Sequence, residues 1–456
     1  MHNAVPRADV YAKIRFGRAE ACDGRRWAGT LRAPAGSPGA RPTPDARSTA
    51  RPRPQQLPRP ERPIGLSLPS GGFFCTPPVR RMTDPRVPAK LALEDGTVVT
   101  GHSVGAPGTA AGELCFNTSM SGYQEILTDP SYVGQLMLMT YPHIGNYGAF
   151  EDATEADRPM AAGLIVRQFC ETPSNARMEE TLAAWMTRHG LVGISDVDTR
   201  RLVRHIRDRG VMNAVVSTEV LDDAALVHLA REVPSMEGLE LASRVTTPTP
   251  YDFADTDGPR VAVYDYGVKR NILRSFRDLG CTVRVFGAST PLEDVLAWGP
   301  DGLFFSNGPG DPRAMPEAIE TVRAAAATDL PVFGICLGHQ LMALAEGLEV
   351  FKMKVGHRGA NHPVLNLGTG HVEITTQNHG FAVSEDEIPP DVAVVNHRNL
   401  NDRTVEGLRF KRFAGMSVQY HPEACPGPHD SRYLFGEFLG MIEERRAAPV
   451  SAQTGS

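Results

Sequence analysis

Short apolar segments alternate with amphipathic segments from residue 261 onward, and this alternation limits the possible fold more than any other feature of the chain. Strands are predicted at 261–264, 282–286, 302–305 and 331–335, and helices at 269–279, 291–298, 316–327 and from residue 339. Such alternation predicts a doubly wound α/β fold, in which helices cover both faces of a mostly parallel sheet. Ligands of such sheets bind at the carboxyl ends of the strands.

The region before this alternation mixes strands and helices less regularly. Residues 91–99, LALEDGTVV, are typical of a strand, an Asp-Gly hairpin turn and a second strand. Further strands are predicted at 136–139 and 163–166, and helices at 179–188 and 199–209. We therefore expect a smaller domain before the α/β domain.

Changes in composition set the expected domain boundaries. The sequence VTTPTPYDFADTDGP has no periodicity and is typical of a linker. We expect, in chain order, an extension over 1–88, the smaller domain over 89–244, the linker over 245–259, the α/β domain over 260–446 and a flexible tail over 447–456.

The first 81 residues cannot build a core of their own. They hold 15 Lys plus Arg against 5 Asp plus Glu, and 13 of the 37 prolines. We expect this basic segment to be a disordered tail, or a mis-annotated start with Met82 as the true first residue. An organelle transit peptide is an alternative that the helix-breaking prolines disfavour, and a nucleic-acid-binding tail is another that lacks aromatic interleaving.

The composition of the chain excludes several classes of protein. Hydrophobic residues make up 41% of the sequence and charged residues 22%, which is typical of globular domains. No uninterrupted apolar run approaches the ~20 residues that cross a bilayer, and the N-terminus lacks the apolar centre of a secretory signal. Seven cysteines without regular spacing indicate a reducing compartment. We expect a cytoplasmic protein that binds neither membranes nor nucleic acid.

The sequence GICLG at 334–338 joins a short apolar strand to a helix and is the most informative segment for chemistry. The glycines on either side of Cys336 allow a tight turn that lifts the sulfur to the helix N-terminus. There the helix dipole and free N–H groups favour the thiolate, which is the nucleophilic form. The alternative is that Cys336 is a buried apolar cysteine.

A second segment supplies a partner for this cysteine. His421 and Glu423 follow a strand predicted at 414–420, and residues two apart on an extended segment face the same side. His421 would reach the thiol while Glu423 fixes the tautomer of the imidazole, which gives a Cys-His-Glu triad. The tripeptide alone favours a surface histidine, but together with the Cys336 turn it favours catalysis.

A third segment, SNGPGDP at 306–312, follows the strand predicted at 302–305 and so lies at the same carboxyl edge. Its small residues let backbone N–H groups approach a ligand. The N–H of Gly308, paired with that of Leu337, would form an oxyanion hole. An ordinary Pro-Gly turn is the alternative.

These segments resemble those of class I glutamine amidotransferases, a family with a flavodoxin-like fold. The matching motifs, in the family's order and spacing, are SNGPGDP, GICLGHQ, QNHGF at 377–381 and QYHPE at 419–423. The first domain resembles the small subunit of carbamoyl phosphate synthetase in FNTSMSGYQEILTDPSY at 116–132, TYPHIGNYG at 140–148 and DVDTRRLVRHIRDRG at 196–210. The resemblance covers about residues 89–445.

The resemblance implies a glutaminase. Cys336 would attack the side-chain amide of glutamine, His421 would pass the proton to the departing ammonia, Glu423 would orient His421, and a γ-glutamyl thioester would then be hydrolysed. The implied glutamine-binding residues are Ser131 from the first domain and Gly308, Gly310, Leu337, Gln340, Asn378, Gly380 and Phe381 from the second. The first domain would be a β/β/α module that contacts a partner.

The implied partner is a separate large subunit, in a heterodimer or a higher oligomer. It would receive ammonia through a protected channel and make carbamoyl phosphate, for pyrimidine and arginine biosynthesis, from bicarbonate with ATP and Mg²⁺. We expect no cofactor in this chain, which has no G-x-x-x-x-G-K-[ST] loop. We also expect no metal, because the ligand-like spacing of His421, Cys425 and His429 falls in a proline-rich turn without a fourth ligand.

Two other functions are alternatives to a glutaminase. The cysteine turn could serve a peptidase or another hydrolase, but the QNHGF and NGPGDP segments and the large first domain disfavour it. A non-catalytic subunit could use the glutamine pocket only to sense the amino acid. The loss of Cys336 or His421 would have favoured that function, and both are present.

Overall fold

The computed structural model describes residues 86–385 and 388–447, so the expectations for the extension up to residue 85 and for the tail from 448 lie outside the described residues. The first domain is built on a closed barrel with the strand order β1-β2-β8-β6-β4-β3-β9. Its strands are β1 (Pro88–Leu93), β2 (Val98–Gly105), β3 (Thr109–Asn117), β4 (Gln135–Met139), β6 (Gly163–Ile165), β8 (Val192–Ser195) and β9 (Met212–Ser217). In the predicted hairpin between β1 and β2, Gly96 takes a φ of 96° and Asp95 accepts a hydrogen bond from the N–H of Thr97.

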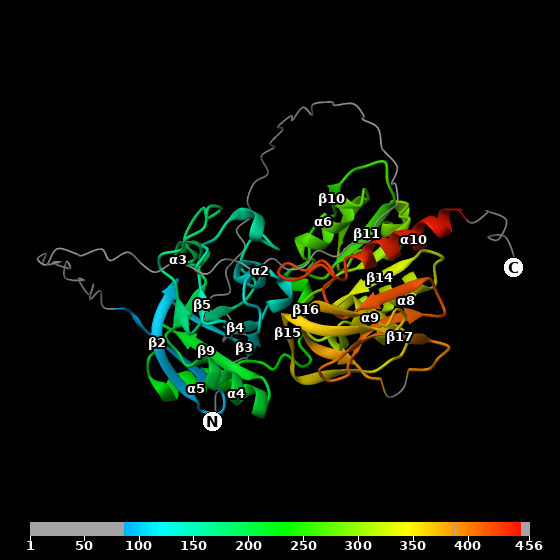
Figure 1. The fold of residues 1–456 in the computed structure, drawn as a ribbon. Coiled ribbons are helices and arrows are strands. Elements are labelled where there is room, and N and C mark those ends of the chain that lie inside the picture. Colours follow the sequence, from blue (N-terminus) through cyan, green and yellow to red (C-terminus); the bar gives the residue numbers. More distant parts are fainter. Residues whose placement is uncertain (1–85, 386–387, 448–456) are drawn as a thin grey trace, which may run out of the picture. The chain divides into compact units, whose positions relative to one another are not determined.

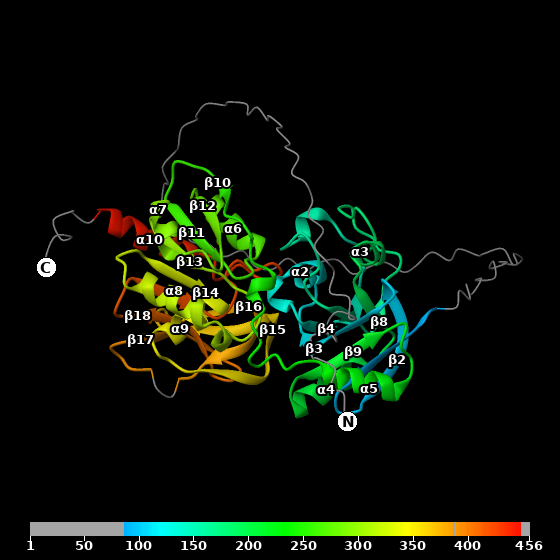
Figure 2. The same cartoon turned by 180° about the vertical axis from the view of Figure 1, so that it is seen from behind.

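Alternating side chains give the barrel strands an inner and an outer face. Leu91, Leu114, Leu136 and Ile194, from four different strands, meet in one buried cluster together with residues of helix α4 (Thr199–Arg209). The outer faces are covered by α2 (Tyr123–Thr128), α3 (Leu182–Arg188) and α5 (Asp223–Glu232). Helix α5 packs on β1 and β9, as both views show (Figures 1 and 2).

The second domain is a sheet with a parallel centre and antiparallel edges. Its strand order is β10-β12-β11-β13-β14-β19-β18-β17-β15-β16, and the strands from β12 to β19 in this order run parallel. The pairs from β19 to β16, and the pair β10-β12, are antiparallel. The strands are β10 (Tyr251–Ala254), β11 (Arg260–Asp265), β12 (Thr282–Gly287), β13 (Gly302–Phe305), β14 (Val332–Ile335), β15 (Val350–Asn366), β16 (Val372–Val383), β17 (Ala393–Asn399), β18 (Val405–Phe410) and β19 (Gly415–Val418).

Helices lie on both faces of this sheet (Figure 1). Along β11, Val261 and Val263 face a core shared with α6 (Arg270–Asp278) and α10 (Tyr433–Ala447). Ala262 and Tyr264 face the opposite core, which is shared with α7 (Leu292–Ala297), α8 (Pro316–Ala326) and α9 (Leu337–Ala345). Buried strands of this kind need apolar residues on both sides. The predicted doubly wound α/β fold is confirmed for the parallel centre.

The structure corrects three details of these expectations. The segment 245–259, expected to be a linker, contains β10, which pairs with β12. The helix after Cys336 begins at Leu337, two residues before the predicted start. The antiparallel extension β15 to β18 was not predicted, because register shifts in β15 break the alternation that identifies a strand.

Within residues 86–385 and 388–447, no helix combines the length and the apolar character that crossing a membrane requires.

Candidate active site

Cys336 lies where β14 ends and α9 begins, at the carboxyl edge of the parallel strands. Its backbone has φ 54° and ψ −101°, which is strained for any residue with a side chain. The turn requires glycine nearby, because a Cβ on Gly338 would lie 2.1 Å from the carbonyl oxygen of Phe305. The thiol donates to the carbonyl oxygen of Asn378 at 3.5 Å. The strained turn therefore directs the sulfur toward strand β16, which contains Asn378.

His421 and Glu423 follow β19 and are fully buried side by side. The Nδ1 atom of His421 lies 2.6 Å from Oε1 of Glu423. Burial alone would lower the pKa of His421, but the Glu423 carboxylate outweighs burial and the neighbouring Lys269, so that the pKa rises to about 10. The Nε2 atom makes no hydrogen bond within the described part of the chain, and Cys336 is close enough to raise the pKa further. The free nitrogen is thus available to the thiol.

Lys269, which the sequence analysis missed, holds Glu423 from behind. Its Nζ lies 2.9 Å from Oε1 of Glu423 and donates to the carbonyl oxygen of Ala424 at 2.6 Å. Asn271 also donates to the Glu423 backbone carbonyl, at 2.5 Å. Burial would raise the pKa of Glu423, but Lys269 and His421 lower it to about 2. The only sequence signal for Lys269 is its place after the first parallel strand, at the edge where ligands bind.

The loop after β13 brings backbone donors next to the cysteine. Gly308 packs so closely that an added Cβ would lie 2.2 Å from the carbonyl oxygen of Tyr266 and 2.8 Å from the Leu337 side chain. The hydrogen bonds of residues 86–385 and 388–447 include none from the backbone N–H of Gly308 or of Leu337. Two donors therefore stand without partners beside Cys336, as an oxyanion hole requires.

A pocket opens in front of Cys336. Seven of the eight residues predicted to bind glutamine line it, and only Leu337 does not. His421 and Glu423 lie behind the cysteine and do not line it either. The lining residues are Ser131, Gln135, Met236, Gly308, Pro309, Gly310, Cys336, Gln340, Lys352, Asn378, His379, Gly380 and Phe381. Sequence reasoning missed Gln135, Met236 and Lys352, which carry no motif signal, and also Pro309 and His379, which lie inside the SNGPGDP and QNHGF motifs.

The first domain closes one side of this pocket through a short 3-10 turn, η1 (Pro130–Tyr132). Asp129 caps the turn by accepting from the N–H of Ser131, and its other carboxylate oxygen accepts from the Asn378 side chain at 2.9 Å. The Oγ of Ser131 accepts from the Asn307 side chain at 2.9 Å. These contacts fix the turn against the loop after β13 and against strand β16, the two segments of the second domain that approach Cys336.

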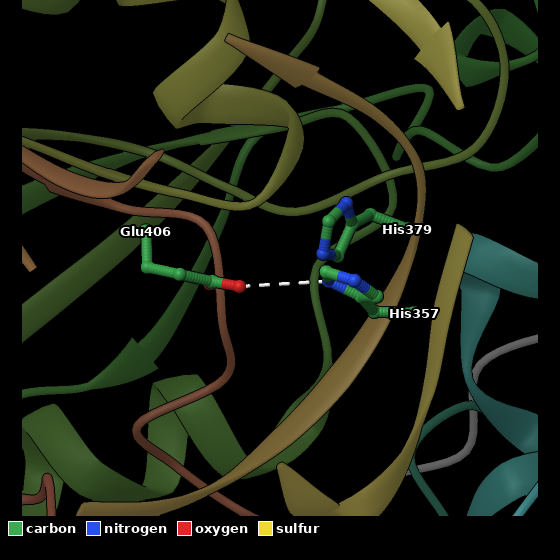
Figure 3. Close-up of side chains that lie close together, drawn as sticks. All are labelled: His357, His379 and Glu406. Carbon is green, nitrogen blue, oxygen red and sulfur yellow. Dashed lines mark ion pairs between the residues drawn. The ribbon is translucent and has the colours of Figure 1, made fainter. Parts of the chain in front are cut away.

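His357, His379 and Glu406 form a buried group whose ligand-type atoms all lie within 4.8 Å of one another (Figure 3). Hydrogen bonds already engage these atoms. His379 bonds to the Phe381 carbonyl and to Gln377, and Glu406 accepts from Asn399 and Gln377. His357 bonds to Asp402 at 2.7 Å. The group is built as a hydrogen-bonded network behind the pocket wall, and the absence of a metal from the site stays a prediction.

Comparisons with known proteins match both domains. The model of the carbamoyl-phosphate synthase small chain, CPSase domain, matches residues 91–216, and the model of class-I glutamine amidotransferase matches residues 262–441. The carbamoyl phosphate synthase small chain of Syntrophotalea carbinolica is 50% identical over an alignment of 374 residues, with 78% of this chain and 98% of that protein covered. The chain belongs to the carbamoyl phosphate synthase small-chain family.

Other members of this family are equally similar. The protein of Chlorobaculum tepidum is 51% identical over 360 residues, with 78% of this chain and 98% of that protein covered. That of Yersinia pestis is 48% identical over 380 residues, with 80% and 97% covered. The predicted family and enzyme class, a glutamine amidotransferase subunit of carbamoyl phosphate synthase, are therefore confirmed.

Proposed function

We propose that this chain hydrolyses L-glutamine with Cys336, His421 and Glu423 and delivers the ammonia for carbamoyl phosphate synthesis. The observation that carries the proposal is the strained Cys336 turn, with His421 and Glu423 buried behind it and the pocket in front of it. In this proposal the nucleophile is the thiolate, and a protonated histidine beside it supplies the proton for the leaving nitrogen, so His421 must carry a charge. The raised pKa of His421 supports this charge state.

The reaction takes two steps. The Cys336 sulfur forms a bond to the side-chain carbonyl carbon of glutamine, the bond from that carbon to nitrogen breaks, and His421 gives its proton to the leaving nitrogen. Water then attacks the γ-glutamyl thioester, His421 takes up its proton, and glutamate leaves while the thiolate returns. Glu423 keeps the Nε2 atom of His421 directed at the sulfur and stabilises the imidazolium.

The negative oxygen of each tetrahedral intermediate would bind the N–H groups of Gly308 and Leu337. Losing a single donor of this kind typically costs about 10²- to 10³-fold in kcat. The pocket residues Ser131, Gln340 and Asn378 would hold the rest of the substrate with hydroxyl and amide groups.

The ammonia would go to a large subunit, which uses ATP and Mg²⁺ to make carbamoyl phosphate from bicarbonate in the cytoplasm. The relatives support this partner, since the name small chain of carbamoyl phosphate synthase implies a larger chain. In this proposal the chain itself needs no cofactor, and it assembles with the large subunit as a heterodimer or a higher oligomer.

The test is Cys336→Ser in the complex with the large subunit. We expect the variant to lose carbamoyl phosphate synthesis from glutamine and to keep synthesis from ammonia, because only the nucleophile is removed. Residual glutaminase activity in the variant would overturn the mechanism. A wild-type complex that uses ammonia but not glutamine would instead favour a chain that senses glutamine without hydrolysing it.

A further inference from the structure

Among the described residues that line the pocket, Lys352 is the only one with a cationic side chain. The other titratable groups there are Cys336 and His379. Burial, followed by the charge of His357, lowers the pKa of His379 well below its usual value, so this imidazole is neutral. Any fixed positive charge that faces a bound ligand directly from the pocket wall therefore comes from Lys352.

Glu113 of the first domain holds Lys352 in place. The Nζ of Lys352, on β15, lies 2.6 Å from Oε2 of Glu113, on β3. The other oxygen of Glu113 lies 3.7 Å from Nη2 of Arg358. Two cations thus share one carboxylate, which leaves one positive charge in excess at this wall.

Both cations approach the part of strand β16 that lines the pocket. A Cβ on Gly380 would lie 3.3 Å from Nη2 of Arg358 and 3.4 Å from Nζ of Lys352, and the Lys352 Nζ lies 5.0 Å from the centre of the Phe381 ring. The ammonium of Lys352 therefore lies against two further lining residues, Gly380 and Phe381.

Gln135 presents an acceptor to the same pocket. It lies on β4, paired with Glu113 in the β3-β4 ladder, and is only 6% exposed. Its Oε1 atom is buried and has no hydrogen-bond partner within residues 86–385 and 388–447. A buried acceptor left without a donor costs free energy, so its place in a pocket wall points to a donor on the ligand.

We propose that Lys352 and Gln135 recognise the two ends of the substrate's amino-acid group, with Lys352 facing the α-carboxylate and Gln135 Oε1 accepting from the α-ammonium. This inference rests on the proposed glutaminase function. It makes the barrel domain, through Glu113 and Gln135, a determinant of substrate specificity. Backbone and amide groups can hold the reacting amide, but a zwitterion also needs one positive group and one acceptor.

Two analogues separate the ends of the substrate. 4-Aminobutanamide is glutamine without the α-carboxylate, and glutaramic acid is glutamine without the α-ammonium. Each retains the side-chain amide that Cys336 would attack. With the full chain in complex with its large subunit, we expect kcat/KM to fall for each analogue by about 10- to 100-fold relative to glutamine, as the loss of a charge-assisted hydrogen bond predicts.

Lys352→Met tests the carboxylate end. We expect KM for glutamine to rise about 10- to 100-fold with kcat within a few-fold of the wild type, and kcat/KM for 4-aminobutanamide to stay unchanged. Lys354→Met is the matched control, because Lys354 lies on the same strand and also reaches the first domain, at the Asp208 carbonyl, but does not line the pocket. The control should leave every rate unchanged.

Gln135→Leu tests the ammonium end in the same way. It should lower kcat/KM for glutamine and leave the value for glutaramic acid unchanged. If either variant lowers kcat/KM equally for glutamine and for the analogue lacking its group, the proposed recognition is wrong. Failure of the glutaminase function would look different, since the wild type would then be inactive on glutamine or Cys336→Ser would remain active.

Discussion

Two lysine–glutamate pairs serve the same pocket in different surroundings. Lys269 and Glu423 have side chains that are 1% and 0% exposed, whereas Lys352 and Glu113 are 17% and 7% exposed. The first pair lies within one domain, next to His421. The second joins the two domains at the pocket wall, where Arg358 also shares the carboxylate. Burial therefore separates a pair that fixes His421 from a pair at the pocket wall that, in our proposal, faces the substrate.

The largest effect should follow from breaking the first pair. Lys269→Met leaves Glu423 and Glu155 buried with less positive charge beside them. We expect a loss of about 3–5 kcal/mol in the free energy of unfolding and a strong loss of glutaminase activity. Urea unfolding of the complexed and the free chain measures the loss of unfolding free energy. The control is Lys354→Met at an exposed position, which we expect to stay within about 0.5 kcal/mol of the wild type. Equal stability of the two variants would contradict the comparison.

Local motifs predicted one of these pairs only in part and the other not at all. Cys336, His421 and Glu423 were found because a tight turn and a two-residue spacing have readable patterns. Lys269 reaches Glu423 across 154 positions of sequence, and Lys352 meets Glu113 across 239, so no local pattern links them. Side-chain partners over such separations are fixed only by the fold.

The same reasoning holds for the fold. The β1-β2 hairpin, helix α4 at Thr199–Arg209 and the parallel centre of the second sheet were predictable, because period 2, period 3.6 and their alternation are local signals. The extension β15 to β18 was not, because its register shifts and polar residues hide the alternation. Strand β10 was missed because a four-residue edge strand differs little from a linker in composition.

His357, with its two carboxylate partners Asp402 and Glu406, extends the comparison to pH. Burial would lower the pKa of His357, but Asp402 and Glu406 raise it to about 9. Its contribution to stability is complete below its ordinary pKa of 6.5 and is lost as the pH rises through 9, on the order of 3 kcal/mol. We expect His357→Gln to flatten the fall in unfolding free energy between pH 6.5 and 9. If the variant keeps the wild-type slope of unfolding free energy against pH, other titratable groups cause the fall.

The smallest effect should come from removing the hydroxyl of Ser131, which the first domain contributes to the pocket. Ser131→Ala removes the acceptor of the Asn307 side chain, and one hydrogen bond is worth about 1 kcal/mol. We expect KM for glutamine to rise about fivefold with kcat unchanged. Ser119→Ala is the control, since the buried Oγ of Ser119 has no partner in the described residues. Equal kinetics of the two variants would show that the barrel domain contributes nothing through Ser131.

The most direct test of the account is to trap the covalent intermediate. The complex is mixed with isotope-labelled glutamine, quenched in acid during turnover and digested, and the peptides are identified by mass spectrometry. We predict a γ-glutamyl group on Cys336 in the wild type and none in Cys336→Ser. Label on another residue, such as the partly buried Cys425, or turnover without any labelled peptide, would contradict the central claim.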